Sequence, residues 1–124
     1  MGLILAIALG GAIGSVLRFV LSKLIQQKIG VSFPAGTFFV NLLGAFFIGL
    51  FFALIVERLS LASHIRAFLI VGLLGGFTTF STFSYESVTL LRNGELFLFV
   101  AYLIGTNIAG LLFTTLGYVL GRLL

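Results

Sequence analysis

Residues 35–56 read AGTFFVNLLGAFFIGLFFALIV, a run without a single charged side chain. A helix of about 20 residues crosses the hydrocarbon core of a bilayer. On either side of this run, similar apolar stretches cover 3–21, 67–91 and 96–120, and the charged residues inside them are Arg18 and Glu86. The sequence thus predicts an all-α integral membrane protein, with one four-helix transmembrane domain over residues 1–124 and approximate spans 3–21, 35–56, 67–91 and 96–120.

The composition excludes most other classes of protein. The chain is 60% hydrophobic and 8% charged, with a mean hydropathy of +1.31, whereas a soluble domain carries about 25% charged residues. It has no cysteine, one histidine and three acidic residues, too few converging groups for an active site, so we expect no enzyme. The basic residues behind the net charge of +4 are scattered. They favour contact with lipid headgroups, and no nucleic-acid partner is expected.

The loop charges do not assign an orientation. With four spans both termini share one side of a cell membrane, and the positive-inside rule should identify that side. The terminal side carries Arg58, Arg66 and Arg122, and the other side carries Lys23, Lys28 and Arg92. Either a weak bias decides the orientation, or the chain inserts in both directions and two opposite copies pair about an axis in the membrane plane.

Small residues recur every four positions in two of the predicted helices. The stripes are Ala6, Gly10 and Gly14 near the N-terminus, with Gly105 and Ala109, and Gly117 and Gly121, in the last span. Small residues let helix backbones approach closely inside a bilayer. Because four helices enclose little space, we expect the protein to oligomerise.

The third apolar stretch departs from a uniform span. Residues 72–84 read GLLGGFTTFSTFS, so a glycine pair and a run of hydroxyl residues fall near its middle. Such residues weaken a helix, and a break at membrane depth exposes carbonyl oxygens that hold a cation without an acidic side chain. The alternative is a continuous polar helix that packs tightly.

Further along, Phe80 and Phe83 share one helix face, with Thr79 and Ser87 beside them. Such a pair usually reflects plain packing, but ring edges carry positive potential and favour an anion. Glu86 lies in an apolar setting, so it either faces a partner or reaches toward the end of the span.

The remaining polar groups in the spans are mostly neutral hydrogen-bond donors. They are Thr37 and Asn41 in the second span, and Tyr102, Thr106 and Asn107 in the fourth. Arg18 either attracts anions to a vestibule or reaches to a headgroup. Neutral donors replace the hydration shell of a small ion, so the residues favour a small-ion pathway, preferably for an anion.

Three motifs resemble the CrcB/Fluc fluoride channel family across essentially the whole chain. They are GGAIGSVLRF at 10–19, GTFFVNLLG at 36–44 and GGFTTFSTFSYE at 75–86. The last is the most specific. Three positions depart from the usual pattern: Ser15 stands in place of Ala, Ala45 where Ser is frequent, and Gly110 where some members carry Ser.

The resemblance implies a passive channel that exports cytoplasmic fluoride, built as an antiparallel dual-topology homodimer with two pores. It implies a third helix broken at mid-membrane, which binds a structural Na⁺ at the dimer centre through the backbone carbonyls of Gly75 and Thr78. No other cofactor is implied.

The resemblance also implies site residues. Phe80 and Phe83 would present ring edges to fluoride, Asn41 would donate to it, and Arg18 would sit at a vestibule. The further pathway residues are Thr37, Thr79, Ser81, Thr82, Glu86, Tyr102 and Thr106 or Asn107. The implied location is the inner or plasma membrane, in multi-pass form.

Two rival functions remain. A small multidrug transporter exchanges protons at a glutamate in its first helix, and the first span here has no acid. A non-transporting scaffold subunit would explain the small-residue stripes but not the Gly-Gly and Thr/Ser cluster.

Overall fold

The first helix, α1 (Gly2–Ile29), is longer than the predicted span 3–21. The computed structural model describes residues 1–30 and 32–124. The polar residues 22–28, expected as a connector, continue the helix because lysine, glutamine and leucine are good helix formers. The helix ends at Gly30, which adopts a left-handed conformation (φ 61°) and donates its N–H to the Gln26 carbonyl at 2.8 Å. Glycine is the usual residue at such an end.

The second span consists of α2 (Ala35–Phe51) and η1 (Phe52–Arg58). In η1 the helix widens to π-type winding. The Leu59 N–H accordingly donates to the Leu54 carbonyl, five residues back, at 2.9 Å. The chain then reverses at Ser60, which has a positive φ of 50°.

The third span has four parts: α3 (Ser63–Arg66), the π-helical η2 (Ala67–Leu74), α4 (Gly75–Phe77) and α5 (Phe80–Arg92). Between α4 and α5, Thr78 (φ −88°, ψ 157°) and Thr79 (φ −148°, ψ 119°) adopt extended backbone.

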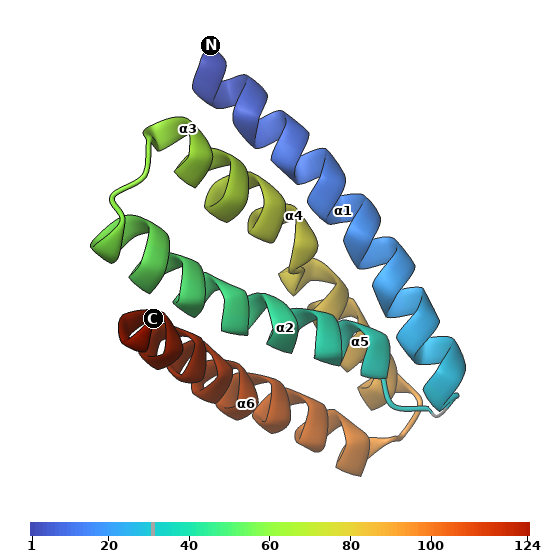
Figure 1. The fold of residues 1–124 in the computed structure, drawn as a ribbon. Coiled ribbons are helices and arrows are strands. Elements are labelled where there is room, and N and C mark those ends of the chain that lie inside the picture. The colour runs from blue at the N-terminus through green and yellow to red at the C-terminus, as the bar shows by residue number, and fades with distance from the viewer. Residues whose placement is uncertain (31) are drawn as a thin grey trace.

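A turn at Gly94 (φ 76°) leads to α6 (Leu96–Leu123). The described chain thus contains four helical segments long and apolar enough to cross a membrane: 2–29, 35–58, 63–92 and 96–123. In Figure 1, α1 and α6 lie on opposite sides of the molecule, with the third span and α2 between them.

The described glycines of α1 pack against the third span. A Cβ at Gly10 would overlap the Phe68 carbonyl oxygen, and a Cβ at Gly14 would overlap that of Leu73. In return, Gly76 lies against the Gly11 carbonyl. Gly10 and Gly14 of the small-residue stripe are therefore buried within one chain, where they bring α1 into backbone contact with η2 and α4.

The helices α2 and α6 approach one another in the same way. A Cβ at Gly49 would overlap the Thr114 carbonyl, and one at Gly117 would overlap the Phe46 carbonyl. At their other end, the buried side chains of Phe83, Leu90 and Tyr102 form the core with partly buried neighbours such as Phe33 and Phe38. Much of the remaining apolar surface is exposed, as a bilayer-facing protein requires.

Candidate functional site

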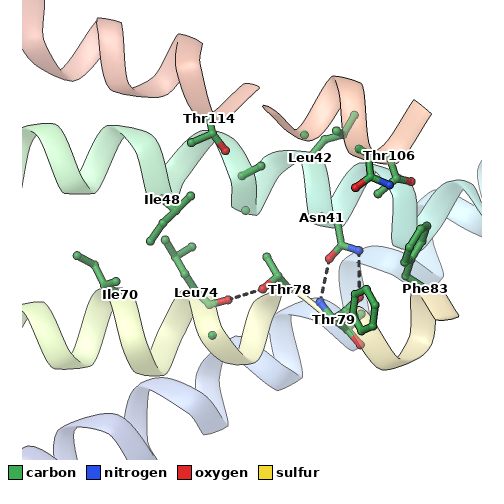
Figure 2. Close-up of a pocket in the computed structure, with 16 residues that line it drawn as sticks. Asn41, Leu42, Ile48, Ile70, Leu74, Thr78, Thr79, Phe83, Thr106 and Thr114 are labelled. Atoms are coloured by element: carbon green, nitrogen blue, oxygen red, sulfur yellow. Dashed lines mark hydrogen bonds between the residues drawn. The ribbon is translucent and has the colours of Figure 1, made fainter. Parts of the chain in front are cut away.

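Thr79, the second of the two extended residues, is held by the side chain of Asn41 on α2. The Asn41 amide nitrogen (Nδ2) donates to the Thr79 carbonyl at 3.1 Å, and the Thr79 N–H donates to Asn41 Oδ1 at 2.9 Å (Figure 2). The side chain thus supplies an acceptor for the Thr79 N–H, whereas the Thr78 N–H still donates to the Leu74 carbonyl at 3.0 Å. Because a primary amide has two N–H groups, one Nδ2 hydrogen remains for another acceptor.

The interruption frees carbonyl groups at the end of α4. In a continuous helix the Thr79 N–H would bond the Gly75 carbonyl, but here it bonds Asn41. The Gly76 carbonyl accepts a hydrogen bond from Arg18 Nε at 3.0 Å. In the same way the Thr82 N–H, which would bond the Thr78 carbonyl in a continuous helix, donates to the Thr79 hydroxyl instead. Two main-chain oxygens therefore remain available at this point.

The first turn of α5 begins with a side-chain cap. The Thr79 hydroxyl accepts from the Thr82 N–H at 3.1 Å and donates to the Thr82 hydroxyl at 3.0 Å. The exposed Ser81 hydroxyl lies 3.4 Å from the Thr79 hydroxyl. Free N–H groups and the positive end of the helix dipole make a helix N-terminus favourable for an anion.

An open cavity of about 440 Å³ lies beside the interruption (Figure 2). No charged residue of the described chain lines it. Its polar lining comes from Asn41, Thr78, Thr79, Thr106, Asn107 and Thr114. The Thr106 hydroxyl is buried and has no hydrogen-bond partner among the described residues. A buried unpaired hydroxyl costs about 1–3 kcal/mol, so this donor is available for a ligand.

Two aromatic rings border the cavity. Phe80 is 78% exposed and Phe83 is 7% exposed, and their ring centroids lie 5.9 Å apart at an interplanar angle of 53°. Phe83 also makes an edge-to-face contact with the Tyr102 ring at 4.9 Å. The buried ring is thus fixed by the core, while the exposed ring has no comparable support within the described chain.

Glu86 belongs to a second cavity, of about 280 Å³, with Thr37, Ser22, Lys23 and Gln26 in its lining. The Thr37 hydroxyl donates to one carboxylate oxygen at 3.1 Å, and the Tyr102 hydroxyl donates to the other at 2.9 Å. Of the two readings of Glu86, the structure therefore supports the one in which it faces partners.

The structure divides the predicted residues between several environments. Around the larger cavity it brings together Asn41, Gly75, Thr78, Thr79, Phe80, Phe83, Thr106 and Asn107. Thr37 and Glu86 line the smaller cavity, and Tyr102 bonds Glu86. Ser81 and Thr82 lie at the start of α5, and Arg18 is bound to Gly76 outside the lining of either cavity.

Three expected donors are already engaged. Thr37 and Tyr102 direct their hydroxyl protons at Glu86. Asn107 donates one of its two amide hydrogens to the Leu103 carbonyl of its own helix at 2.8 Å. Sequence reasoning did not identify Thr114, which lines the larger cavity eight residues after Thr106. The four-residue spacing from Thr106 through Gly110 to Thr114 is the signal that would have found it.

The comparisons with known proteins agree across the chain. The family model for CrcB-like protein, Camphor Resistance (CrcB), matches residues 5–118. The chain is 63% identical to the fluoride-specific ion channel FluC of Aquifex aeolicus, covering 98% of both chains. It is 50% identical to a channel of the same name from Thermus thermophilus, covering 94% of this chain and 93% of that one. For the FluC of Chloroflexus aurantiacus the identity is 49%, over 96% and 94%.

These matches and the four apolar helices show that the protein is a multi-pass membrane protein. The family model covers most of the chain, and the relatives match nearly end to end. On this ground the chain belongs to the CrcB-like protein family.

Proposed function

We propose that the protein is a passive, fluoride-selective channel that lets cytoplasmic fluoride leave the cell and so reduces its toxicity. Fluoride enters from acidic surroundings as neutral HF and ionises in the less acidic cytoplasm, where the anion is trapped. A selective anion pathway releases it down its gradient without an energy source. The names of the relatives support fluoride as the ion. The observation that carries the proposal is a cavity of neutral donors without a charged lining residue in the described chain.

The donors around that cavity suit a small anion. Asn41 keeps one free amide hydrogen, and the Thr106 hydroxyl has no partner among the described residues. At the start of α5 the Thr82 N–H is bonded to the Thr79 hydroxyl, which leaves the backbone N–H groups of Phe80 and Ser81 without a helical partner. The rings of Phe80 and Phe83 lie at the same cavity and supply positive edges. Neutral donors replace water around fluoride without binding it so tightly that it cannot leave.

We propose that a second copy in antiparallel orientation completes this pathway, giving two pores per dimer. The support is the state of the single chain: Phe80 is 78% exposed, and Ser81 and Asn107 are exposed polar groups in membrane-spanning segments. An exposed polar face is costly in hydrocarbon and favours a protein partner. The balanced loop charges agree with insertion in both orientations.

We also propose a structural Na⁺ at the dimer centre, held by the carbonyls of Gly75 and Thr78 from both copies. The residues fit this ion, because the N–H groups that would bond both oxygens in a continuous helix are bonded elsewhere, and hard cations prefer oxygen ligands. Carbonyl ligands are also the ones available, since the described residues contain no cluster of three or more His, Cys, Asp or Glu side chains. The interruption would then lie at mid-membrane.

The second cavity provides a continuation of the path in this proposal. Phe83 contacts Tyr102, which with Thr37 holds the Glu86 carboxylate. A hydroxyl that rotates away from Glu86 becomes a donor to a passing anion. Arg18, next to the interruption, would draw anions toward a vestibule.

The direct test is fluoride efflux from liposomes that contain the purified protein, followed with a fluoride electrode and with chloride efflux in parallel. We expect fast fluoride release and little chloride release. Release of neither ion from a folded dimer would overturn the channel proposal and favour the scaffold role. Equal release of both ions would overturn the selectivity.

A further inference from the structure

A third hollow, separate from the two cavities described above, lies between α1, α2 and the first half of the third span. We call it the apolar groove. It has a volume of about 410 Å³ and no polar lining. Leu17, Leu21 and Leu24 of α1 face Phe47 and Phe51 of α2 across it, and Leu73, Leu74 and Phe77 complete the lining. The fluoride proposal makes no use of this groove.

The apolar groove lies on a different side of α2 from the polar cavity. Asn41, Ala45 and Ile48 line the polar cavity, whereas Leu43, Phe47 and Phe51 line the groove. Leu74 lines both cavities and therefore forms part of the wall between them. A second copy placed on the polar side therefore leaves the groove open to the bilayer, where an acyl chain is the matching occupant.

The positive charge of Lys28 lies beyond the end of the groove, toward the membrane surface. Lys28 follows Leu24 by four residues and Leu21 by seven, so it lies on the same face of α1, about 6 Å further along the axis. It is exposed, and no acidic group in the described part of the chain contacts it. Lys23, by contrast, lies on another face of α1, with its ammonium 5.7 Å from the Phe19 ring centroid.

We propose that the apolar groove binds an anionic glycerophospholipid, with one acyl chain along the leucines of α1 and the phosphate at Lys28. The apolar lining excludes the headgroup from the groove, and the cation at its end selects a negative headgroup. The site does not depend on the fluoride proposal.

The chain lacks tryptophan, which makes the site measurable. The Phe47→Trp variant carries a single tryptophan in the groove, and bromine atoms on a lipid acyl chain quench its fluorescence on contact. The variant is placed in phosphatidylcholine vesicles that contain, at equal mole fraction, either brominated phosphatidylglycerol or brominated phosphatidylcholine. We expect phosphatidylglycerol to occupy the groove with a preference of about fivefold, the ratio for one lysine near an anionic lipid surface.

Three controls make the result specific. The Leu116→Trp variant reports ordinary lipid contact, because Leu116 is 58% exposed and its neighbour Gly117 lies against Phe46, at the level of the groove. We expect equal quenching by both lipids there. Adding Lys28→Gln to Phe47→Trp should remove the preference, and adding Lys23→Gln should leave it. If Phe47→Trp does not give a folded protein, Leu24→Trp on the opposite wall serves the same purpose.

The proposal is overturned if both brominated lipids quench the groove fluorophore equally, or if Lys28→Gln leaves the preference unchanged. It is also overturned if neither lipid quenches it more than a soluble quencher does, because protein would then cover the groove.

Discussion

The side chain of Asn41 bonds both backbone polar groups of Thr79. Its amide accepts from the Thr79 N–H and donates to the Thr79 carbonyl, at 2.9 and 3.1 Å. Without Asn41 the Thr79 N–H would be unpaired inside the span, at a cost of several kcal/mol in lipid. The same residue therefore holds the backbone and offers one donor to the cavity.

This double role predicts the effect of Asn41→Asp. The carboxylate still accepts from the Thr79 N–H, but it no longer donates to the Thr79 carbonyl, and it adds a negative charge to an uncharged cavity. We expect fluoride efflux to be abolished and stability in detergent to fall by about 1–3 kcal/mol. Asn93→Asp, in the exposed turn before Gly94, is the matched control and should change neither measurement. Normal efflux from Asn41→Asp would contradict the assigned role.

Phe80 gives a second prediction at the residue scale. Because its ring is 78% exposed in the single chain, Phe80→Ile should leave the protomer fold intact while it removes the ring edge from the pathway. We expect strongly reduced fluoride efflux from a protein that still dimerises, measured with the fluoride electrode and by size exclusion. Phe97→Ile, at a ring that is 82% exposed on α6, should retain full efflux. Unchanged efflux from Phe80→Ile would remove that ring from the proposed pathway.

At the scale of elements, the packing of α1 on the third span depends on glycines that touch carbonyl groups. A Cβ at Gly14 would overlap the Leu73 carbonyl, whereas a Cβ at Gly11 would lie an ordinary 3.8 Å from the Gly72 carbonyl. These nearby positions on one helix thus differ sharply in the space they offer.

We therefore expect Gly14→Ala to destabilise the protein by about 1–3 kcal/mol, because backbone contacts cannot move as a flexible side chain does. Gly11→Ala should be neutral or stabilising, since alanine is favoured over glycine in a helix by about 1 kcal/mol. Unfolding followed by circular dichroism in detergent measures both. Equal stability of the two variants would show that α1 and η2 separate at little cost.

At the scale of the whole molecule, orientation decides how the pathway is completed. The chain has no cysteine, so Asn93→Cys introduces a single thiol in the turn between α5 and α6. If both orientations occur, a membrane-impermeant maleimide added outside intact cells should label part of the protein, and the rest should react only after permeabilisation. Complete labelling from one side would contradict the dual topology.

The proposed central Na⁺ gives a further prediction at this scale. A ligand that binds only the assembled dimer stabilises it by mass action. Monomers in detergent that are reassembled in Na⁺-free potassium buffer should yield less dimer and less fluoride efflux than in sodium buffer. Identical assembly and efflux in both buffers would argue against the ion.

The fold class and the four spans follow from the amino-acid sequence alone, because an uncharged run long enough to cross a bilayer has few other structures open to it. The unusual segment at 72–84 is also evident there, since glycine pairs and hydroxyl clusters are uncommon in a uniform span. The residues at which the helices end were harder to predict from the sequence. The helix α1 runs to Ile29 because good helix formers continue it past the apolar limit at Leu21.

The partners of the polar residues, by contrast, follow only from the folded molecule. The sequence shows that Asn41, Thr37, Tyr102 and Glu86 are present. It does not show that Asn41 pairs with the Thr79 backbone, or that the Thr37 and Tyr102 hydroxyls donate to Glu86. It also did not show that the glycines of residues 10–14 are used within the chain. Periodicity assigns a residue to a face of its own helix, whereas contacts between helices depend on how closely two backbones approach, which is a property of the packed molecule.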